Sequence, residues 1–355
     1  MRKPRLFALA AAALAAAFSL NASAAQKSSF DVCWTIYAGW MPWEYGATQG
    51  IVDKWAKKYG IEIKVTQLND YVESINQYTA GQFDGCTMTN MDALTIPAAG
   101  GVDSTALIVS DFSNGNDGIV LKGEGKTLGD LKGLPVNLVE LSVSHYLLAR
   151  ALERAHLAEK DVQVVNTSDA DIAAAFDTDE VQAVTTWNPM LAEIKAKPGT
   201  SLVFDSSKVP GEIMDMMVVN TETLKDNPAL GKALTGAWFE IVALMKAGTA
   251  ESTAALTHMA KASGTDLAGY QAQLDATRLF GTPAEALEFV TSPKLPATMD
   301  KVATFSFAHG LLGEGAKDAH AVGMSFAKGL VTGDKANVKL RFDPTYVQMA
   351  ADGTL

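Results

Sequence analysis

Two short segments of this chain, residues 84–90 (DGCTMTN) and residues 182–188 (QAVTTWN), share one pattern. Each follows an apolar, helix-like run and a turn, and each predicts a short strand that ends in polar groups. In open α/β sheets, ligands bind in the crevice outside the carboxyl ends of the strands. The pattern therefore predicts two α/β lobes that face one ligand, and the residues nearest to it are expected to be Thr89, Asn90, Trp187 and Asn188.

The rest of the chain alternates between strand-like and helix-like segments up to residue 220, and amphipathic helical patterns dominate from residue 227 onward. About 330 residues exceed the size at which one core usually stops growing. The turn-rich run 111–118 (DFSNGNDG) marks a crossover between lobes. We expect an α/β protein whose first lobe is discontinuous (residues 25–114 plus 221–355, including C-terminal helices) and whose second lobe (residues 115–220) is inserted into it.

The first 24 residues resemble a secretory signal peptide. Three cations precede an apolar run over residues 6–20, and small residues at 22–24 provide a cleavage site. The apolar run is shorter than the ~20 residues of a membrane span, and no cysteine follows it for a lipid anchor. We therefore expect secretion without membrane insertion. Cleavage removes the three cations and changes the formal charge from −11 to −14, and such a surface disfavours nucleic acid as a partner.

The two cysteines, Cys33 and Cys86, both fall in predicted strands. If these strands are neighbours, as in the strand order 2-1-3, the sulfur atoms could approach each other, and an oxidising compartment would permit a disulfide. Bridges between adjacent strands strain the preferred geometry, however. The expectation favours two reduced, packed thiols and leaves the disulfide open.

Three further segments carry a family resemblance: residues 130–136 (DLKGLPV), residues 142–146 (SVSHY) and residues 186–189 (TWNP). Together with the signal peptide and the paired lobes, they resemble the periplasmic substrate-binding proteins of ABC transporters, in the nitrate/sulfonate/taurine class. Within that class the chain resembles the branch associated with urea carboxylase genes, for which urea or guanidine has been the suggested ligand. The resemblance implies a type II-like two-lobe fold with doubly wound sheets and a helical C-terminal extension. It also implies a small-molecule solute and a permease partner, and we expect a monomer.

An aromatic segment follows the first predicted strand. Residues 37–45 (YAGWMPWEY) contain four aromatic side chains, and the glycine and proline among them predict a loop. Large aromatic side chains on a loop are better explained by a ligand or by the opposite lobe than by a core. Tyr37, Trp40 and Trp43 are therefore candidate ligand-binding residues, whereas Trp34 is expected in the core.

Charge distinguishes between possible ligands. The remaining candidate loops carry acidic residues, and the chain has no arginine between Arg5 and Arg150. A sulfonate or nitrate would usually meet an arginine fork, although helix N-termini alone can hold an anion. Aromatic faces beside carboxylates are instead typical of a cation site. Guanidinium fits this pattern better than urea, whose carbonyl oxygen requires a donor.

Glu140 and Asp215 rank first among the candidate carboxylates, because one follows a predicted strand directly and the other lies between two methionines. Ser142 is expected to cap the next helix, and His145 to face the cleft from that helix. The other acidic residues are assigned structural roles: Asp92 as a helix cap and Asp111 as part of the crossover turn.

Catalytic patterns are scarce. The chain has no G-x-S-x-G elbow, its Gly-Lys-Thr at 125–127 lacks the first glycine of a phosphate loop, and its five histidines form no H-x-x-x-H or H-E-x-x-H spacing. We therefore expect a receptor without catalytic residues, metal or cofactor. Three alternatives stay open: a sulfonate, taurine or nitrate receptor, an enzyme resembling the thiamine-pyrimidine synthases, and a periplasmic scaffold that binds proteins.

Overall fold

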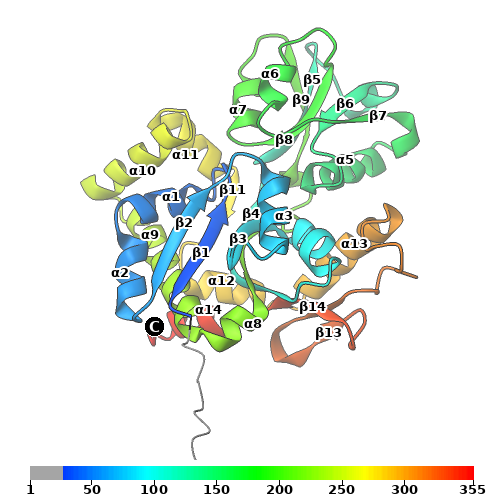
Figure 1. The fold of residues 1–355 in the computed structure, drawn as a ribbon. Helices are drawn as coiled ribbons and strands as arrows, with labels where there is room; N and C mark the ends of the chain where they lie inside the picture. Colours follow the sequence, from blue (N-terminus) through cyan, green and yellow to red (C-terminus); the bar gives the residue numbers. More distant parts are fainter. Residues whose placement is uncertain (1–26) are drawn as a thin grey trace, which may run out of the picture.

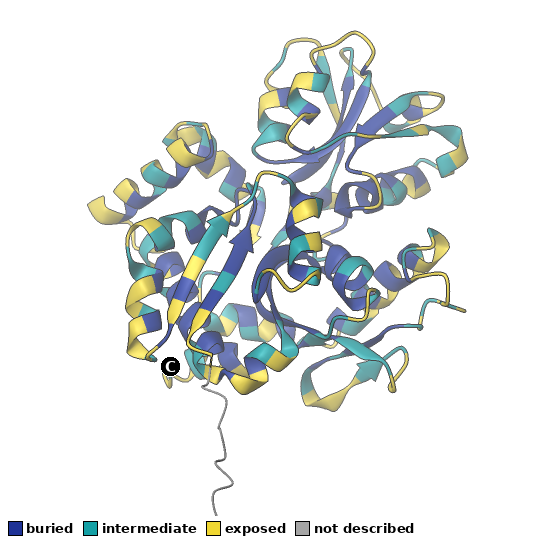
Figure 2. Ribbon diagram, in the orientation of Figure 1, coloured by how far each residue is buried: buried dark blue, intermediate teal, exposed yellow. Residues whose placement is uncertain are grey.

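The computed structural model describes residues 27–355, so the expected signal peptide lies outside the described residues. Two separate sheets form two lobes, a larger one below and a smaller one above in Figure 1. This arrangement confirms the expected α/β class with two lobes. In both lobes the central strands are buried, whereas edge strands such as β2 and the outer faces of the surrounding helices are partly exposed (Figure 2).

The larger lobe contains a nine-stranded sheet in the order β13-β12-β14-β4-β10-β3-β1-β2, with β11 paired to β4. Its centre has the predicted order 2-1-3, in which β1 lies parallel to both β2 and β3. The strands are β1 Ser29–Trp34, β2 Glu62–Gln67, β3 Gly85–Thr89, β4 Ser104–Ser113, β10 Met214–Asn220, β11 Thr277–Leu279, β12 Gly323–Ser325, β13 Val331–Thr332 and β14 Val338–Phe342.

Helices surround this sheet, and most of them come from the C-terminal part of the chain, which confirms the predicted helical extension (Figure 1). α9 is apolar over most of its circumference and is the most deeply buried of the long helices. The helices are α1 Met41–Thr48, α2 Ile51–Lys58, α3 Tyr71–Thr79, α4 Asn90–Ala93, α8 Thr221–Asp226, α9 Pro228–Lys246, α10 Ala250–Ala262, α11 Leu267–Asp275, α12 Pro283–Val290, α13 Leu295–Ala308 and α14 Thr345–Ala351.

The smaller lobe contains a five-stranded sheet in the order β7-β6-β8-β5-β9, in which β6 is parallel to β7 and β8. Its strands are β5 Asp117–Lys122, β6 Pro135–Leu138, β7 Gln163–Asn166, β8 Ala183–Trp187 and β9 Thr200–Asp205. Its helices are α5 Val143–Arg154, α6 Ile172–Ala175 and α7 Met190–Lys195, with short 3₁₀ turns at Leu128–Leu131 and Glu159–Asp161.

Three sequence-based expectations are wrong. β10 pairs with β3 and β4, so residues 214–220 belong to the larger sheet and not to the second lobe. The segment from Met41 to Thr48 is a helix, α1, in which Pro42 occupies the first turn, where a missing N–H costs nothing. The run 111–118 is not entirely a turn, because β4 continues to Ser113 and β5 begins at Asp117.

Cys33 and Cys86 form a disulfide bond, so the expectation of two reduced thiols is also wrong. β1 and β3 are parallel neighbours, and the two cysteines are directly opposite each other in their register. The pairing brings the two Cα atoms to 4.4 Å, at the lower end of the range that a disulfide spans. The bond therefore joins two strands at the centre of the larger sheet.

Candidate ligand-binding site

A small pocket, called the cavity below, lies where the carboxyl end of β3 meets the carboxyl end of β8. It is narrow, so we expect a ligand with few atoms. Both lobes contribute to the lining, which comprises Tyr37, Trp40, Tyr71, Thr89 and Asp215 from the larger lobe and Asp117, Val143 and Trp187 from the smaller lobe.

Four aromatic rings form a continuous wall around this cavity. Tyr37 meets Trp40 edge to face at 5.0 Å between ring centroids, and Trp40 lies 5.9 Å from Tyr71. Tyr71 meets Trp187 of the opposite lobe edge to face at 5.5 Å. The wall therefore crosses from one lobe to the other, and it closes only when the lobes are together.

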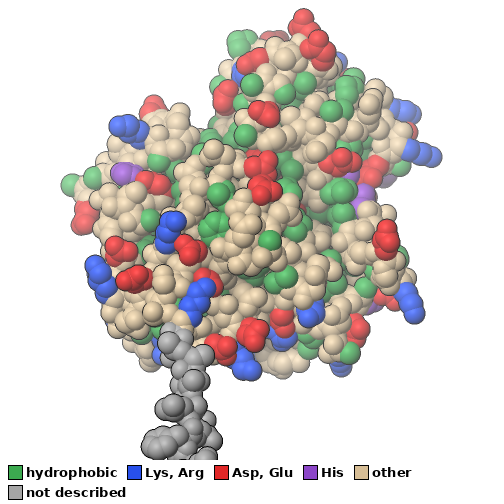
Figure 3. Space-filling view, in the orientation of Figure 1, with side chains coloured by type: hydrophobic (Ala, Val, Ile, Leu, Met, Phe, Trp, Pro, Cys, Tyr) green, Lys and Arg blue, Asp and Glu red, His purple; other side chains and the backbone are tan. Residues whose placement is uncertain are grey.

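Hydrogen bonds hold the lobes in this closed arrangement. The indole Nε1–H of Trp187 donates to the Ile36 carbonyl oxygen at 3.3 Å, and the Tyr71 backbone N–H donates to Asp169 Oδ1 of the smaller lobe at 3.3 Å. On the side of α7 and α11, the surface is hollowed into a wider groove between the lobes (Figure 3). The cavity is thus buried beneath contacts that an open form would lack.

Carboxyl groups line the cavity and also lie next to its lining. Asp215 and Asp117 line it directly, from β10 and β5. Asp111 lies behind Asp215 and accepts hydrogen bonds from Tyr37 Oη at 3.0 Å and from Ser110 Oγ at 2.9 Å. The chain passes close by at Gly39, where a Cβ atom would lie 2.8 Å from Asp111 Oδ2, so a side chain there would displace this carboxyl group.

Asp92 supports the aromatic wall from below. It is fully buried and accepts hydrogen bonds from Tyr71 Oη at 2.6 Å and from Thr89 Oγ1 at 2.8 Å. Tyr71 Oη in turn accepts the backbone N–H of Thr89 at 2.9 Å. The network sets the position of Tyr71, whose ring faces the cavity.

Burial is the main cause of the shifted pKa values of these carboxyl groups. It raises the pKa of Asp92 and Asp111 to about 6 and that of Asp117 to about 7. Burial also raises the pKa of Asp215, and the charges of Asp111 and Asp117 raise it further. A cation in the cavity would stabilise the ionised carboxylates and lower all four pKa values.

Five of the candidate residues from the sequence come together at this cavity: Tyr37, Trp40, Thr89, Trp187 and Asp215. Two of them also have an unsatisfied atom, because Asp215 Oδ2 and Trp40 Nε1 are buried and have no hydrogen-bond partner within residues 27–355. A buried carboxylate oxygen without a partner is costly, and a ligand that donates hydrogen bonds would satisfy it.

The remaining candidates lie elsewhere in the molecule. Trp43 is buried in α1 against Trp238, with ring centroids 5.2 Å apart, because its segment is a helix and not a loop. Glu140 is exposed and borders a separate groove, because the chain turns outward after β6. The expectation that ranked Glu140 first is not supported by this geometry.

Polar candidates at the two strand ends have structural partners. The Asn90 side chain accepts a hydrogen bond from the Met214 backbone N–H at 2.9 Å and donates one to the Glu212 carbonyl oxygen at 3.1 Å. These bonds connect α4 to the segment that leads into β10. The backbone carbonyl oxygen of Asn188 accepts a hydrogen bond from the Ala38 backbone N–H at 3.3 Å. This bond links the two lobes.

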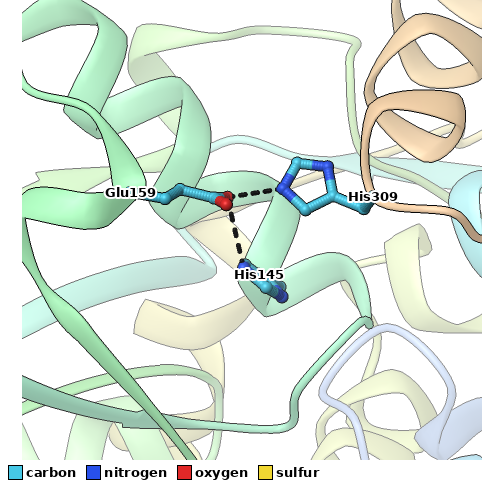
Figure 4. A group of neighbouring side chains, drawn as sticks. All are labelled: His145, Glu159 and His309. Carbon is cyan, nitrogen blue, oxygen red and sulfur yellow. Dashed lines mark hydrogen bonds and ion pairs between the residues drawn. The ribbon is translucent and has the colours of Figure 1, made fainter.

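The two candidates in and before α5 do not line the cavity. Ser142 is the N-cap of α5, as predicted, and accepts the Ser144 backbone N–H at 3.2 Å. His145 points toward Glu159 (Figure 4), and it is not among the residues that line the cavity.

Sequence reasoning missed Tyr71, Asp117 and Val143, and assigned Asp92 and Asp111 structural roles. Tyr71 follows Asp70, the predicted helix cap, and helix periodicity alone gives no reason to select its first residue. Asp117 and Asp111 both lie in the turn-like run 111–118. Two aspartates occur in this run of eight residues, which contains the end of β4 and the start of β5. Aspartates at strand ends could have marked this run as part of the site.

The fold and the site together define a class. A two-lobe α/β chain with a cavity at the junction of its lobes has the periplasmic binding protein fold, and solved structures with this fold match most of the chain. The alkanesulfonate-binding protein SsuA from Xanthomonas axonopodis pv. citri, bound to MOPS, matches with a TM-score of 0.67 at 15% identity, over 82% of this chain and 96% of that one. SsuA from Escherichia coli matches with a TM-score of 0.66 at 20% identity, over 81% and 94%.

The chain belongs to the NMT1/THI5-like family, whose model matches residues 47–247. A Brucella abortus protein named "putative binding protein" is 28% identical over 145 residues, which are 40% of this chain and 44% of the relative. An Escherichia coli K12 protein named for aliphatic sulfonate binding is 37% identical over 82 residues, which are 23% of this chain and 26% of the relative. The matched part thus spans less than half the length of these curated relatives. Within residues 27–355, no helix is long and apolar enough to cross a membrane.

Proposed function

We propose that this protein is the periplasmic solute receptor of an ABC importer and that it captures a small nitrogenous cation, guanidinium in preference to urea. The observation that carries the proposal is the cavity lining, in which aromatic faces and two aspartates surround a small space, and to which no lysine or arginine of the described chain contributes. Cation–π attraction is worth up to ~2 kcal/mol in a desolvated site.

Electrostatics favours a cation over the alternatives. Asp111 and Asp92 stand directly behind the cavity lining, and a cation would offset part of the negative charge of this group. A sulfonate or nitrate would face these carboxyl groups without a positive partner among the lining residues that the structure describes. Urea is neutral and would leave the charges uncompensated. The relatives named for sulfonates support the assignment to solute receptors. The acidic lining supports a positively charged ligand rather than the negatively charged sulfonate of those names.

Lobe closure explains how such a receptor signals that it is loaded. The ligand in the cavity would contact residues of both lobes, and it would favour the closed form over the open form by its differential affinity for the two. The closed form is then the one that a permease recognises. The lining combines aromatic faces with carboxyl groups, which suits the binding of a cation, and we therefore favour binding without turnover over an enzyme of the thiamine-pyrimidine synthase kind.

A ligand panel tests the proposal. The purified mature protein is titrated with guanidinium chloride, urea, sodium nitrate and taurine by calorimetry, with melting curves recorded in parallel and sodium chloride as the salt control. A ligand at ~100 times its dissociation constant adds about 2.7 kcal/mol to stability. We expect guanidinium to raise the melting temperature at micromolar concentrations and to be recovered unchanged. A response to taurine or nitrate in its absence would overturn the proposal.

A further inference from the structure

A second cluster of chemically active side chains lies apart from the cavity. His145, Glu159 and His309 converge from α5, from the 3₁₀ turn Glu159–Asp161 and from the end of α13 (Figure 4). Glu159 Oε1 lies 3.2 Å from His145 Nε2 and 2.7 Å from His309 Nε2. One potential ligand atom from each of the three residues lies within 4.8 Å of the others.

The hydrogen bonds of His309 determine which of its nitrogens is available. Its Nδ1 lies 2.8 Å from the Phe305 carbonyl oxygen, and a carbonyl can only accept, so Nδ1 carries the proton. In the neutral ring the lone pair is then on Nε2 and points at Glu159 Oε1. Two acceptors at this distance need either a proton or a metal ion between them.

His145 adds the second nitrogen. Its side chain is only 5% exposed, and the one partner of its buried Nε2 in the described chain is Glu159, at 3.2 Å and without hydrogen-bond geometry. Both imidazole rings are held in place by Phe305, which stacks on His309 at 4.0 Å and meets His145 edge to face at 6.0 Å.

Metal binding through Nε2 of His145 would place the ring proton on Nδ1, which now accepts the Leu141 backbone N–H at 3.1 Å. The Leu141 N–H would then need another acceptor. Leu141 is exposed, so water can take that place. The tautomer that binds a metal is therefore accessible to His145.

We propose that His145, Glu159 and His309 bind a divalent transition-metal ion of the Zn²⁺ type. Two neutral imidazoles and one carboxylate are a common three-ligand set for zinc, with water in the fourth position. Ligand atoms around a tetrahedral zinc ion lie about 3.3 Å apart, since each is about 2.0 Å from the metal, and small side-chain shifts bring this cluster to that spacing. The His309 bond to a backbone carbonyl is the outer contact that typically orients a metal-bound histidine.

The position of this site gives it a role beyond that of the proposed receptor cavity. His145 and Glu159 belong to the smaller lobe, whereas α13 packs on the larger lobe, where Met299 contacts Asn90. An ion held by all three side chains would therefore bridge the lobes beside the cleft and stabilise the closed form. None of its three ligands lines the solute cavity, so the ion is distinct from the transported solute.

Calorimetric titration of tag-free, chelator-treated mature protein with zinc chloride tests this site. We expect one ion per chain, and at least tenfold weaker binding in His309→Gln and in Glu159→Gln. His320→Gln is the matched control, because His320 is exposed and lies outside the cluster. X-ray absorption at the zinc edge should show nitrogen and oxygen ligands, including two imidazoles.

Separate measurements keep this proposal distinct from the proposed function. Melting curves without metal establish that each variant is folded, and guanidinium titration of His309→Gln should match the wild type. Absence of stoichiometric zinc binding by the wild type would overturn the site, and so would equal zinc affinity in wild type and His309→Gln.

Discussion

Asp111 and Asp215 lie directly opposite each other on the antiparallel strands β4 and β10, and both are buried. Burial raises the pKa of both carboxyl groups, and the charge of Asp111 raises that of Asp215 further. Two like charges this close cannot both ionise readily. The relationship makes the cavity sensitive to pH and to any cation that enters it.

Stability of the ligand-free protein should fall as the pH rises from about 5 to about 7.5. The folded-state pKa values of Asp92 and Asp117, about 6 and about 7, exceed the unfolded value of about 3.9. The folded state therefore binds more protons in this window, and its advantage is lost on deprotonation. A carboxyl pKa that is higher by one in the folded state corresponds to about 1.4 kcal/mol. Thermal melting across the pH range measures this, and a melting temperature that climbs steadily from pH 5 to pH 7.5 would contradict it.

Cation binding should release protons near pH 6.5, because the bound charge lowers the pKa of the cavity carboxyl groups. Titrations in two buffers with different ionisation enthalpies give the number of protons exchanged. Affinity for guanidinium should also rise between pH 5.5 and pH 7.5. Proton uptake on binding would indicate an anionic ligand instead.

Asp117→Asn should weaken guanidinium binding at least tenfold, because it removes a charge from the lining and keeps the shape of the side chain. A hydrogen bond to a charged group is worth about 1.5–3 kcal/mol. Glu140→Gln is the matched control, since Glu140 is exposed and borders a different groove, and its affinity should stay within about twofold of wild type. Calorimetry of both variants decides whether the cavity or the outer groove holds the ligand.

Trp187→Ala should reduce the binding free energy by on the order of 1–2 kcal/mol. It removes one ring of the aromatic wall and the hydrogen bond to the Ile36 carbonyl oxygen across the cleft. Its stability should fall less than the ~3–5 kcal/mol typical of a core tryptophan. Trp43→Phe, in the core beside Trp238, should show the reverse pattern of lower stability with unchanged affinity. Normal binding by a Trp187→Ala protein that melts far lower would make Trp187 a core residue.

Denatured protein should take up no alkylating groups without a reductant and two after reduction, because Cys33 and Cys86 are joined. The Cys33→Ala/Cys86→Ala double variant should be less stable by about 2–4 kcal/mol, since the bond closes a long loop in the unfolded chain. Chemical denaturation measures the difference. Two groups incorporated without reductant would show that the thiols are free.

Local sequence patterns predict the parts of the fold that depend on nearby residues. The 3.6-residue periodicity identifies α9 at its observed bounds, and the cap before α3 is Asp70, which accepts the Glu73 backbone N–H. The strand ends predicted at Thr89 and Trp187 do line the cavity. Hydrophobic period, capping residues and strand ends are all properties of a few consecutive residues, which explains this success.

The same local patterns do not predict which strands pair with each other. The sequence pattern assigns residues 214–220 to the second lobe, whereas hydrogen bonds to β3 and β4 put them in the first. The direct alignment of Cys33 with Cys86 likewise follows from the register of two strands, which no local pattern specifies. Glu140 follows a strand as predicted, yet the turn after that strand directs it outward.

Local patterns were thus sufficient to define the two α/β lobes, the helical C-terminal part and the aromatic, acidic character of the segments that surround the cleft. Long-range packing selected which acidic groups meet there, namely Asp117 and Asp215 rather than Glu140. It also brought together His145 and His309, which are 164 positions apart. The difference arises because composition and periodicity act through neighbours along the chain, whereas a site forms from side chains that packing and strand register bring together from distant segments.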